Sequence, residues 1–289
     1  MKEQVWLRYG KEEEDFHFDH VTRTEPFGRN NHFHSTYEIY YLIAGHRAYF
    51  IKDRSYLVTP GSLVFINKQE VHKTSDVEVP GHERIVVNFS DRMLEGGSPP
   101  PRLLLSAFHS VSRVLPLKLA EQGFVQSLMA KLSRELSLQK EGYDLYIRLM
   151  LAELLLFAGR LADETGSPEE PVEIDNPVHR KITEVVRHLN TRFHEPIRLS
   201  DLSDQFYVSP YYLSRMFRKV TGFTLIEYVH TMRIKEAQKL LAETPLKVIE
   251  ISEAVGFDNL AHFGRVFKKL NKVPPHQYRK RHRADKLLE

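Results

Sequence analysis

The last third of the chain repeats itself. The segment 213–219 (LSRMFRK) resembles 263–269 (FGRVFKK) at an offset of 50 residues, and Tyr228 and Tyr278 keep the same offset. A repeat of this length is typical of a duplicated supersecondary unit. Its apolar residues recur at helical spacing, so the repeat predicts an all-α region that contains two copies of one helical motif.

The first copy predicts two short helices joined by a tight turn. Ser200 or Ser203 is expected to cap the first helix, and Ser209 and Pro210 suit the N-cap and the first position of the second helix. The apolar face of the second helix is expected to be buried, which leaves a basic face exposed. That exposed face carries Tyr211, Ser214, Arg215, Arg218 and Lys219.

The second copy follows the same plan between Val248 and Leu270. Gly256 suits a turn position with positive φ, and Asp258 or Asn259 is expected to cap the helix that follows. A short helix, a tight turn and a second helix with a basic exposed face are typical of the helix-turn-helix. The basic residues of the second copy are Arg265, Lys268 and Lys269.

A single long helix over residues 224–243 is predicted between the two copies. A helix of about 20 residues spans about 30 Å, which is close to the ~34 Å of one turn of B-DNA. The connector could therefore hold two recognition helices in successive major grooves. Arg233 in this connector is expected to have a structural role. For Tyr212 and His262, packing in the core and exposure to the DNA are both consistent with the sequence.

The charge distribution also points to nucleic acid. Residues 1–176 carry 20 Lys and Arg against 26 Asp and Glu, whereas residues 177–289 carry 21 against 12. Such an asymmetry is typical of a nucleic-acid-binding module attached to an acidic module. Taken alone, this charge asymmetry is equally well explained by chance variation between two solvated surfaces.

The segment from about Lys181 to Arg281 resembles the DNA-binding domain of the AraC/XylS family of transcription regulators. The residues that carry this resemblance are 199–202 (LSDL), 209–219 (SPYYLSRMFRK), 232–237 (MRIKEA), 240–241 (LL), 255–257 (VGF), 265–269 (RVFKK) and 274–279 (PPHQYR). The resemblance implies that both recognition helices enter the major groove of promoter DNA. By position, it implies that bases are read by Tyr211, Ser214, Arg215, Leu260, Ala261, Gly264 and Arg265. It implies phosphate contacts by Ser209, Arg218, Lys219, Asn259, Lys268 and Lys269.

The second recognition helix departs from the family pattern. Leu260, Ala261 and Gly264 stand where a polar base reader is often found, and Arg265 has a donor fork that suits guanine. The first unit is therefore expected to read more sequence than the second.

The N-terminal part predicts a different architecture. Residues 17–89 contain short runs rich in β-branched and aromatic residues, separated by turn signals, which is typical of a small barrel or sandwich. Helices are predicted at about 102–113, 121–139 and 143–163. The whole chain is thus predicted to be α+β, with a barrel and dimerisation helices over 1–164, a linker over 165–177 and the double helix-turn-helix domain over 178–283.

Histidines are clustered in this N-terminal part. His32, His34 and Glu38, followed by Gly45 and later by His72, resemble the pattern of the cupin barrel. In metal-binding cupins, the matching positions ligate one divalent ion, and three imidazoles with a carboxylate suit a first-row transition metal. The alternative is a pocket without metal in which these residues bind an organic effector, and no certain cofactor is predicted.

Together these features predict a DNA-binding transcription activator that is controlled by a small-molecule effector, with a sugar as the expected class. The predicted partners are double-stranded promoter DNA, the effector, RNA polymerase and a second copy that packs against a stripe formed by Phe124, Leu128, Leu132 and Leu136. A dimeric regulator without an effector and a metal-dependent cupin enzyme tethered to DNA remain as alternatives. No catalytic residue is predicted, because no Ser/His/Asp arrangement or phosphate-binding loop is present. The absence of cysteine, of an N-terminal signal sequence and of a membrane span predicts a cytoplasmic location.

Overall fold

A computed structural model describes residues 3–25, 34–77, 80–95, 102–110, 112–164 and 176–285. The chain divides into two compact units, Met1–Asp175 and Asn176–Glu289. Residues 165–175 of the predicted linker lie outside the described residues. Within the described part, no helix combines the length and apolar character that crossing a membrane requires.

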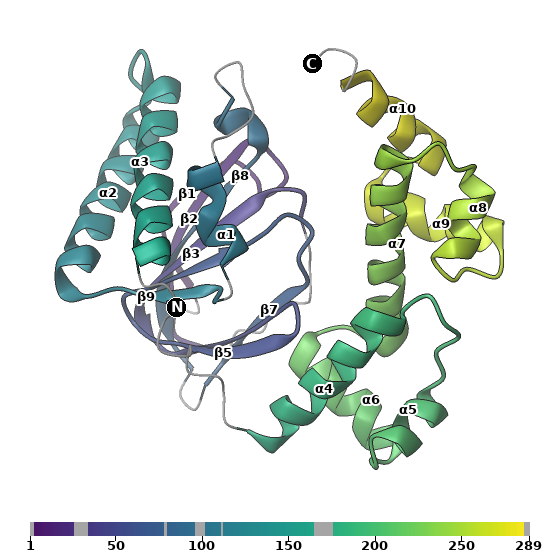
Figure 1. Ribbon diagram of the computed structural model, residues 1–289. Coiled ribbons are helices and arrows are strands. Elements are labelled where there is room, and N and C mark those ends of the chain that lie inside the picture. Colours follow the sequence, from purple (N-terminus) through teal and green to yellow (C-terminus); the bar gives the residue numbers. More distant parts are fainter. Residues whose placement is uncertain are drawn as a thin grey trace. The chain divides into compact units, whose positions relative to one another are not determined.

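Two antiparallel sheets form the first unit (Figure 1). The larger sheet has the order β1-β2-β8-β3-β6-β9, and the smaller has the order β5-β4-β7. Their facing sides share one core of alternating residues, which includes Tyr40 from β3 and Tyr49 from β4. The strands are β1 (Glu3–Tyr9), β2 (Phe16–Arg23), β3 (Tyr37–Gly45), β4 (Arg47–Ile51), β5 (Arg54–Val58), β6 (Ser62–Ile66), β7 (His72–Asp76), β8 (His82–Phe89) and β9 (Val114–Pro116).

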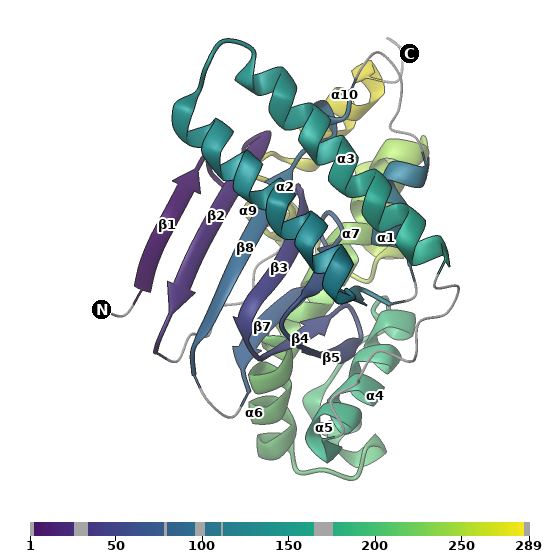
Figure 2. The ribbon, with the colours of Figure 1, turned by 90° about the vertical axis from the view of Figure 1, so that its left-hand side faces the viewer.

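The other face of the larger sheet is covered by two helices, α2 (Leu119–Leu138) and α3 (Tyr143–Glu164) (Figure 2). Their bounds agree closely with the predicted helices over 121–139 and 143–163. Leu128, Leu132 and Leu136, which were expected to form a dimer contact, are instead buried against this sheet in the same chain. That assignment of the stripe was wrong, because the apolar sheet face needs cover within the chain.

The predicted helix over 102–113 is confirmed only over residues 102–109, and there it is not one continuous α-helix. The chain forms a short 3-10 turn, η2 (Arg102–Leu105), and one helical turn, α1 (Ser106–His109). Ser110 is already extended, with φ −58° and ψ 151°. The chain then adds β9 to the edge of β6, where Leu63 pairs with Leu115. An open strand edge offers unpaired backbone groups, and β9 pairs with those of β6.

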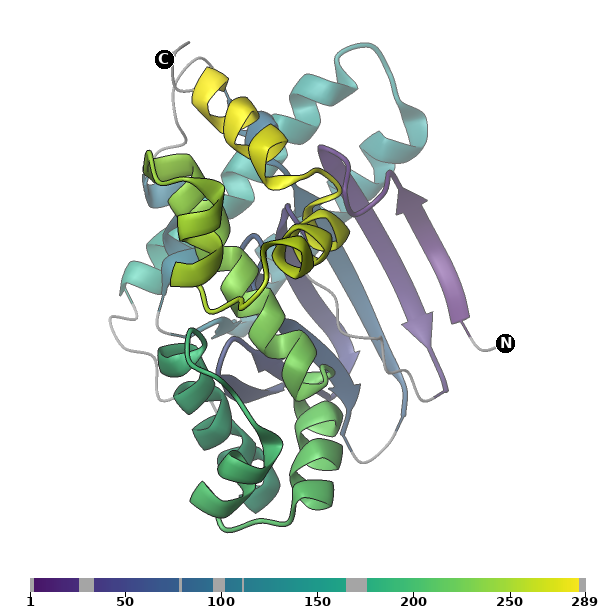
Figure 3. The same ribbon diagram turned by 90° about the vertical axis from the view of Figure 1, so that its right-hand side faces the viewer.

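Helices alone make up the described part of the second unit (Figure 3). They fall into two halves joined by one long helix, α7 (Leu225–Glu243), as the repeat predicts. Ile234, Ala237 and Leu241 of α7 belong to the core of the C-terminal half. The other helices are α4 (Pro177–Arg192), α5 (Leu199–Gln205), α6 (Pro210–Thr221), α8 (Val248–Ala254), α9 (Leu260–Asn271) and α10 (Pro275–Asp285).

Candidate nucleic-acid interface and sensor site

The first helix-turn-helix consists of α5, a turn and α6. The hydroxyl oxygen of Ser209 accepts a hydrogen bond from the backbone N–H of Tyr212 at 3.3 Å, and Pro210 occupies the first turn of α6, as predicted. The predicted cap of α5 was wrong. This helix begins after Arg198, which makes no side-chain cap, and the hydroxyl of Ser203 donates to the carbonyl of Ser200 within the helix. Because Ser203 is buried, its hydroxyl needs a hydrogen-bond partner within the protein, and the Ser200 carbonyl is that partner.

The exposed face of α6 is the predicted one. Leu213, Phe217 and Val220 are buried. Tyr211 is 74% exposed, and Tyr212 is 41% exposed. The other exposed residues of this face are Ser214, Arg215, Arg218 and Lys219. The helix therefore has a row of hydroxyl, guanidinium and ammonium groups along its exposed face.

The second helix-turn-helix consists of α8, a turn and α9. Asn259 is the N-cap, and its side-chain oxygen accepts hydrogen bonds from Ala261 N at 2.8 Å and His262 N at 3.1 Å. Phe263 and Phe267 are buried. Leu260, Ala261, Arg265, Lys268 and Lys269 are exposed, and Gly264 is half-buried. The structure therefore brings the predicted residues of this unit together on one side of α9.

Gly256 lies in the turn between α8 and α9 with φ +92°, as predicted. A Cβ atom on Gly256 would lie 2.3 Å from the backbone oxygen of His194. Gly256→Ala is therefore expected to destabilise the second unit by at least about 1–3 kcal/mol, because strained φ and a backbone clash act together. Urea unfolding of the full chain, followed by circular dichroism, measures this loss.

Gly264→Ala is the matched control, because a Cβ atom there meets nothing within 4 Å. This helical position should gain about 0.5–1 kcal/mol from the same substitution. Equal stability of the two variants would contradict the role given to the Gly256 turn.

Arg233 has the predicted structural role. Its guanidinium donates to the backbone oxygens of Phe193 at 2.7 Å and Glu195 at 2.8 Å, and lies 5.5 Å from the centre of the Phe257 ring. Burial lowers the pKa of Arg233. The Arg233 side chain thus links the loop before α5 to α7 by hydrogen bonds.

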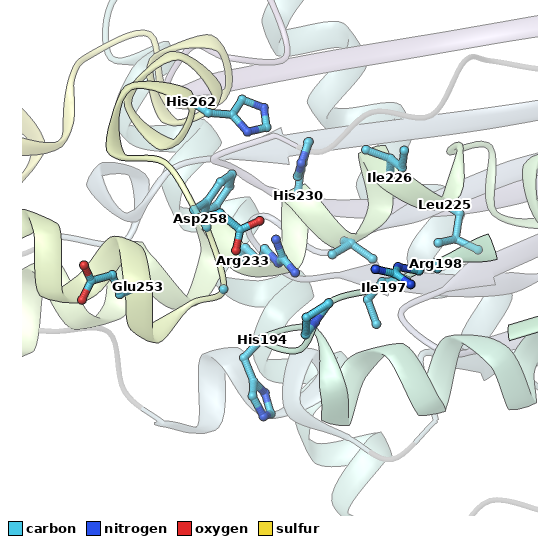
Figure 4. A pocket seen from close by; sticks show the side chains of 14 residues that line it. His194, Ile197, Arg198, Leu225, Ile226, His230, Arg233, Glu253, Asp258 and His262 are labelled. Carbon is cyan, nitrogen blue, oxygen red and sulfur yellow. The ribbon is translucent and has the colours of Figure 1, made fainter. Parts of the chain in front are cut away.

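A groove of about 700 Å³ separates the two helix-turn-helix units (Figure 4). It is lined by the loop before α5, the N-terminal half of α7 and the turn before α9. His230 of α7 and His262 of α9 lie on one side, with ring centres 5.2 Å apart, and His194 lies across from them. His262 is exposed but also contacts the Phe257 ring. Sequence reasoning missed this groove, because its residues come from three separate segments.

A second polar cluster lies inside the first unit. His34, Glu38 and His72 are buried, and one ligand atom from each lies within 4.8 Å of the others. His34 Nε2 is 3.2 Å from a Glu38 carboxylate oxygen, and the His34 and His72 ring centres are 5.1 Å apart. Three of the four predicted residues are thus brought together, whereas His32 lies outside the described residues.

Hydrogen bonds orient both imidazoles of this cluster. His34 Nδ1 is 2.8 Å from the Thr36 carbonyl oxygen, and His72 Nδ1 is 2.8 Å from the Glu70 carbonyl oxygen. The Nε2 atom of His34 is therefore directed towards the Glu38 carboxylate. Burial alone would lower the pKa of His34, but the hydrogen bond and charge of Glu38 outweigh it and leave this pKa raised.

Asn88 extends the cluster, and Tyr40 shares the face of β3 that carries Glu38; both were missed from the sequence. Asn88 of β8 pairs in register with Glu38 of β3, and its amide donates to the Glu38 carboxylate at 3.1 Å. The side-chain oxygen of Asn88 and the hydroxyl of Tyr40 are buried and have no hydrogen-bond partner among the described residues. Burial raises the pKa of Tyr40 to about 12. A polar residue inside the apolar run 85–89 (IVVNF) was the available sequence signal.

The opposite end of the same strands holds buried arginines. Arg84 pairs with Asp19 at 2.8 Å, and Arg47 pairs with Asp76. Burial, together with the charges of these and a third arginine, lowers the pKa of His82 to about 3. The interior of the first unit is thus polar at both ends of its apolar middle.

Comparison with protein-family models gives two matches. An AraC-like ligand binding domain matches residues 20–155, and a helix-turn-helix domain matches residues 202–281. The two matched segments follow one another in the same order as the two structural units.

Individual relatives are also regulators. The regulatory protein PocR of Salmonella typhimurium is 29% identical over 103 residues, which cover 36% of this chain and 34% of PocR. The uncharacterized HTH-type transcriptional regulator YfiF of Bacillus subtilis is 24% identical over 279 residues, which cover 89% of this chain and 80% of YfiF. The chain therefore spans about a third of PocR but most of YfiF.

Among solved structures, the DNA-binding domain of AdpA in complex with a target DNA is 28% identical, with a TM-score of 0.35. The similarity covers 36% of this chain and 95% of that domain. With an AraC-like ligand-binding domain followed by a DNA-binding helix-turn-helix domain, the chain is an AraC-type transcription regulator, a member of a family that is not enzymatic.

Proposed function

We propose that this regulator binds promoter DNA sequence-specifically through α6 and α9 and is controlled by a small molecule bound in the first unit. The observation that carries the DNA part is the pair of capped helices with exposed polar faces, joined by the single helix α7. The 19 residues of α7 span about 28 Å. This length suits two recognition helices in adjacent major grooves. The proposed base readers are Tyr211, Ser214, Arg215, Leu260, Ala261, Gly264 and Arg265.

The remaining polar groups of the two units are proposed to hold the DNA backbone. Hydroxyl, amide and cationic groups at the start and along the side of a recognition helix suit phosphate oxygens. The proposed phosphate contacts are Ser209, Arg218, Lys219, Asn259, Lys268 and Lys269. The groove residues His230 and His262 lie between the two helix-turn-helix motifs. The DNA backbone between the two half-sites would pass there.

Affinity for a duplex selected from random DNA, compared with a scrambled duplex of equal length, tests this function. A sequence-specific regulator should prefer the selected duplex by about 10³-fold or more at physiological salt. Equal affinities would leave only charge-driven binding and would contradict the proposal.

The effector is proposed to bind at the His34, Glu38 and His72 cluster. The buried oxygens of Asn88 and Tyr40 support this site, because buried polar groups normally have hydrogen-bond partners. A sugar supplies several hydroxyl groups that can both donate and accept, which suits this mixture of groups.

Thermal unfolding with a panel of sugars tests the site. A sugar at 100 times its dissociation constant should stabilise the first unit by about 2.7 kcal/mol, and Asn88→Ala should reduce this effect. A panel without any shift would favour a unit that only supports dimerisation.

A divalent metal is the second candidate for the same site. The specific observation is that one atom from each of His34, Glu38 and His72 can approach a single point. Two imidazoles and a carboxylate suit a first-row transition ion with open positions, which could bind an effector oxygen. The Nδ1 atoms of His34 and His72 already lie next to backbone carbonyl oxygens, as the second nitrogen of a metal-bound histidine usually does.

Removal of one ligand tests the metal directly. His34→Ala should abolish stoichiometric metal in the purified full chain, measured by elemental analysis, while circular dichroism stays unchanged. The variant His20→Ala, which alters a histidine that is bonded to Glu83 and stacked on Trp6, is the control and should keep its metal. Stoichiometric metal in the His34 variant would exclude this site.

We further propose that the regulator acts as a homodimer and as an activator that contacts RNA polymerase. Cyclic dimers with two-fold symmetry are the commonest oligomers, and a dimer would double the DNA contacts.

A further inference from the structure

The turn of the first helix-turn-helix has a tyrosine in a backbone conformation that favours glycine. Tyr207, between α5 and α6, has φ +55° (Figure 1). This left-handed region is sterically unfavourable for a bulky side chain, so a tyrosine there costs conformational free energy. In the described part of the chain, the other non-glycine residues with positive φ are lysines and glutamines. An interaction of the Tyr207 side chain is therefore needed to explain why a tyrosine occupies this turn.

The second copy of the motif shows what the turn itself requires. The N–H of Tyr207 donates to the Asp204 carbonyl at 3.3 Å, and the N–H of Gly256 donates to the Glu253 carbonyl at 2.9 Å. In each turn, the next N–H donates to the carbonyl five residues earlier at 3.0 Å. The two turns thus have the same backbone hydrogen bonds, and the second is made with glycine. The turn does not depend on a tyrosine side chain.

Packing within the chain does not explain the tyrosine either. Tyr207 is 94% exposed, more than any other large hydrophobic residue of the described part. A side chain with this exposure buries almost no surface on folding, so it adds little to the stability of the domain. Its ring and hydroxyl are instead available to a molecule outside the chain. Tyr211, in the first turn of α6, is also exposed.

We propose that the Tyr207 hydroxyl donates a hydrogen bond to a phosphate oxygen of the DNA strand that borders the half-site under α6. This inference rests on the DNA binding proposed above and adds a contact to it. Tyr207 precedes Ser209, the N-cap of α6, by two residues. The N-terminal residues of a recognition helix enter the major groove, so the turn before them lies near the phosphates at its edge. Tyrosine hydroxyls are among the groups that bind phosphates in protein–DNA complexes.

The contact belongs to the first motif alone. Gly256 has no side chain to offer, and a Cβ atom there would lie 2.3 Å from the backbone oxygen of His194. Phosphate contacts fix the register and orientation of a protein on the duplex. Tyr207 therefore positions α6 on its half-site, and α9 has no equivalent group at this place in its turn.

DNA titrations of the full chain test the proposal with a selected and a scrambled duplex. Tyr207→Phe removes only the hydroxyl and should weaken binding to both duplexes by about tenfold, as expected for one hydrogen bond to a charged group. Because the hydroxyl carries no charge, the salt dependence should keep the wild-type slope, in contrast to the loss of a cationic phosphate contact.

Two further variants separate the contact from the turn. Tyr207→Gly and Tyr207→Asn remove the ring as well, and both residues accept a positive φ. Each should weaken binding at least as much as Tyr207→Phe. The thermal unfolding temperature of Tyr207→Gly should be equal to or above that of the wild type, because the unfavourable backbone conformation is relieved.

The outcomes distinguish this contact from the proposed function itself. A wild-type chain that binds both duplexes equally contradicts sequence-specific binding. A wild-type preference that persists with full affinity in Tyr207→Gly contradicts the Tyr207 contact alone. Weak binding by the Gly variant but not by the Asn variant would mean that a flexible turn causes the loss, and full affinity of Tyr207→Phe would exclude the hydroxyl. A lower unfolding temperature of Tyr207→Gly would give Tyr207 a structural role and contradict the proposal.

Discussion

Arg215→Ala is expected to weaken binding to the selected duplex by about 5–150-fold and to remove the preference for the base that Arg215 contacts. Arg215 is exposed on α6 beside Ser214, and the turn that precedes the helix is fixed by the Ser209 cap. Its guanidinium can donate two hydrogen bonds to the acceptors of guanine in the major groove, a contact worth about 1–3 kcal/mol. Gel-shift titrations against a selected duplex, and against duplexes with one substituted base pair, measure both the lost affinity and the lost preference.

Lys268→Ala is the control for an exposed cation on the other recognition helix, α9. As a phosphate contact, it should weaken all duplexes to a similar extent and reduce the salt dependence by about one unit of slope. An Arg215 variant with unchanged base preference would contradict the assignment of Arg215. Loss of base preference in the Lys268 variant would contradict the phosphate assignment.

The second unit of the fold was largely predictable from sequence, because local signals there agree with the tertiary structure. Ser209 with Pro210, Asn259 and Gly256 each indicate a helix start or a turn, and the structure has each of them in that role. The helix-turn-helix occurs twice in this unit, so a weak sequence signal in one copy was supported by the corresponding signal in the other copy. The cap of α5 was mispredicted because Ser203 satisfies its hydroxyl inside the helix.

The first unit was less predictable, because non-local contacts determine it. The strand at Val114 was not predicted, because its pairing with the edge of β6 is a non-local contact. The stripe that includes Leu132 has the periodicity of any amphipathic helix, and periodicity does not state which surface covers it. Asn88 joined the candidate site only through its register with Glu38, and register across a sheet is not visible in one sequence.

The two recognition helices are expected to contribute unequally. Tyr211, Ser214 and Arg215 offer hydroxyls and a guanidinium to base edges. On α9, Leu260 is 44% exposed and Ala261 is exposed, and neither has a hydrogen-bonding side chain. These two can contact only a thymine methyl group. The half-site under α6 should therefore show strict base preference, and the half-site under α9 should be looser, with a guanine opposite Arg265.

Substitution of each operator position in turn measures this difference. Mismatches under α6 should cost about 1–3 kcal/mol each, and most mismatches under α9 should cost clearly less. Comparable penalties in both half-sites would mean that water-mediated or backbone contacts give α9 its own specificity, which contradicts the expected asymmetry.

The claim that two linked helices read one face of DNA is tested most directly by selecting bound duplexes from a random pool with the full chain. The selected sequences should contain two blocks whose centres are about 10–10.5 base pairs apart, the spacing of successive major grooves. The block under α6 should be the more strongly enriched, and the spacing should be constant because the single helix α7 joins the two units. A single block, blocks at variable spacing or no enrichment would contradict this account.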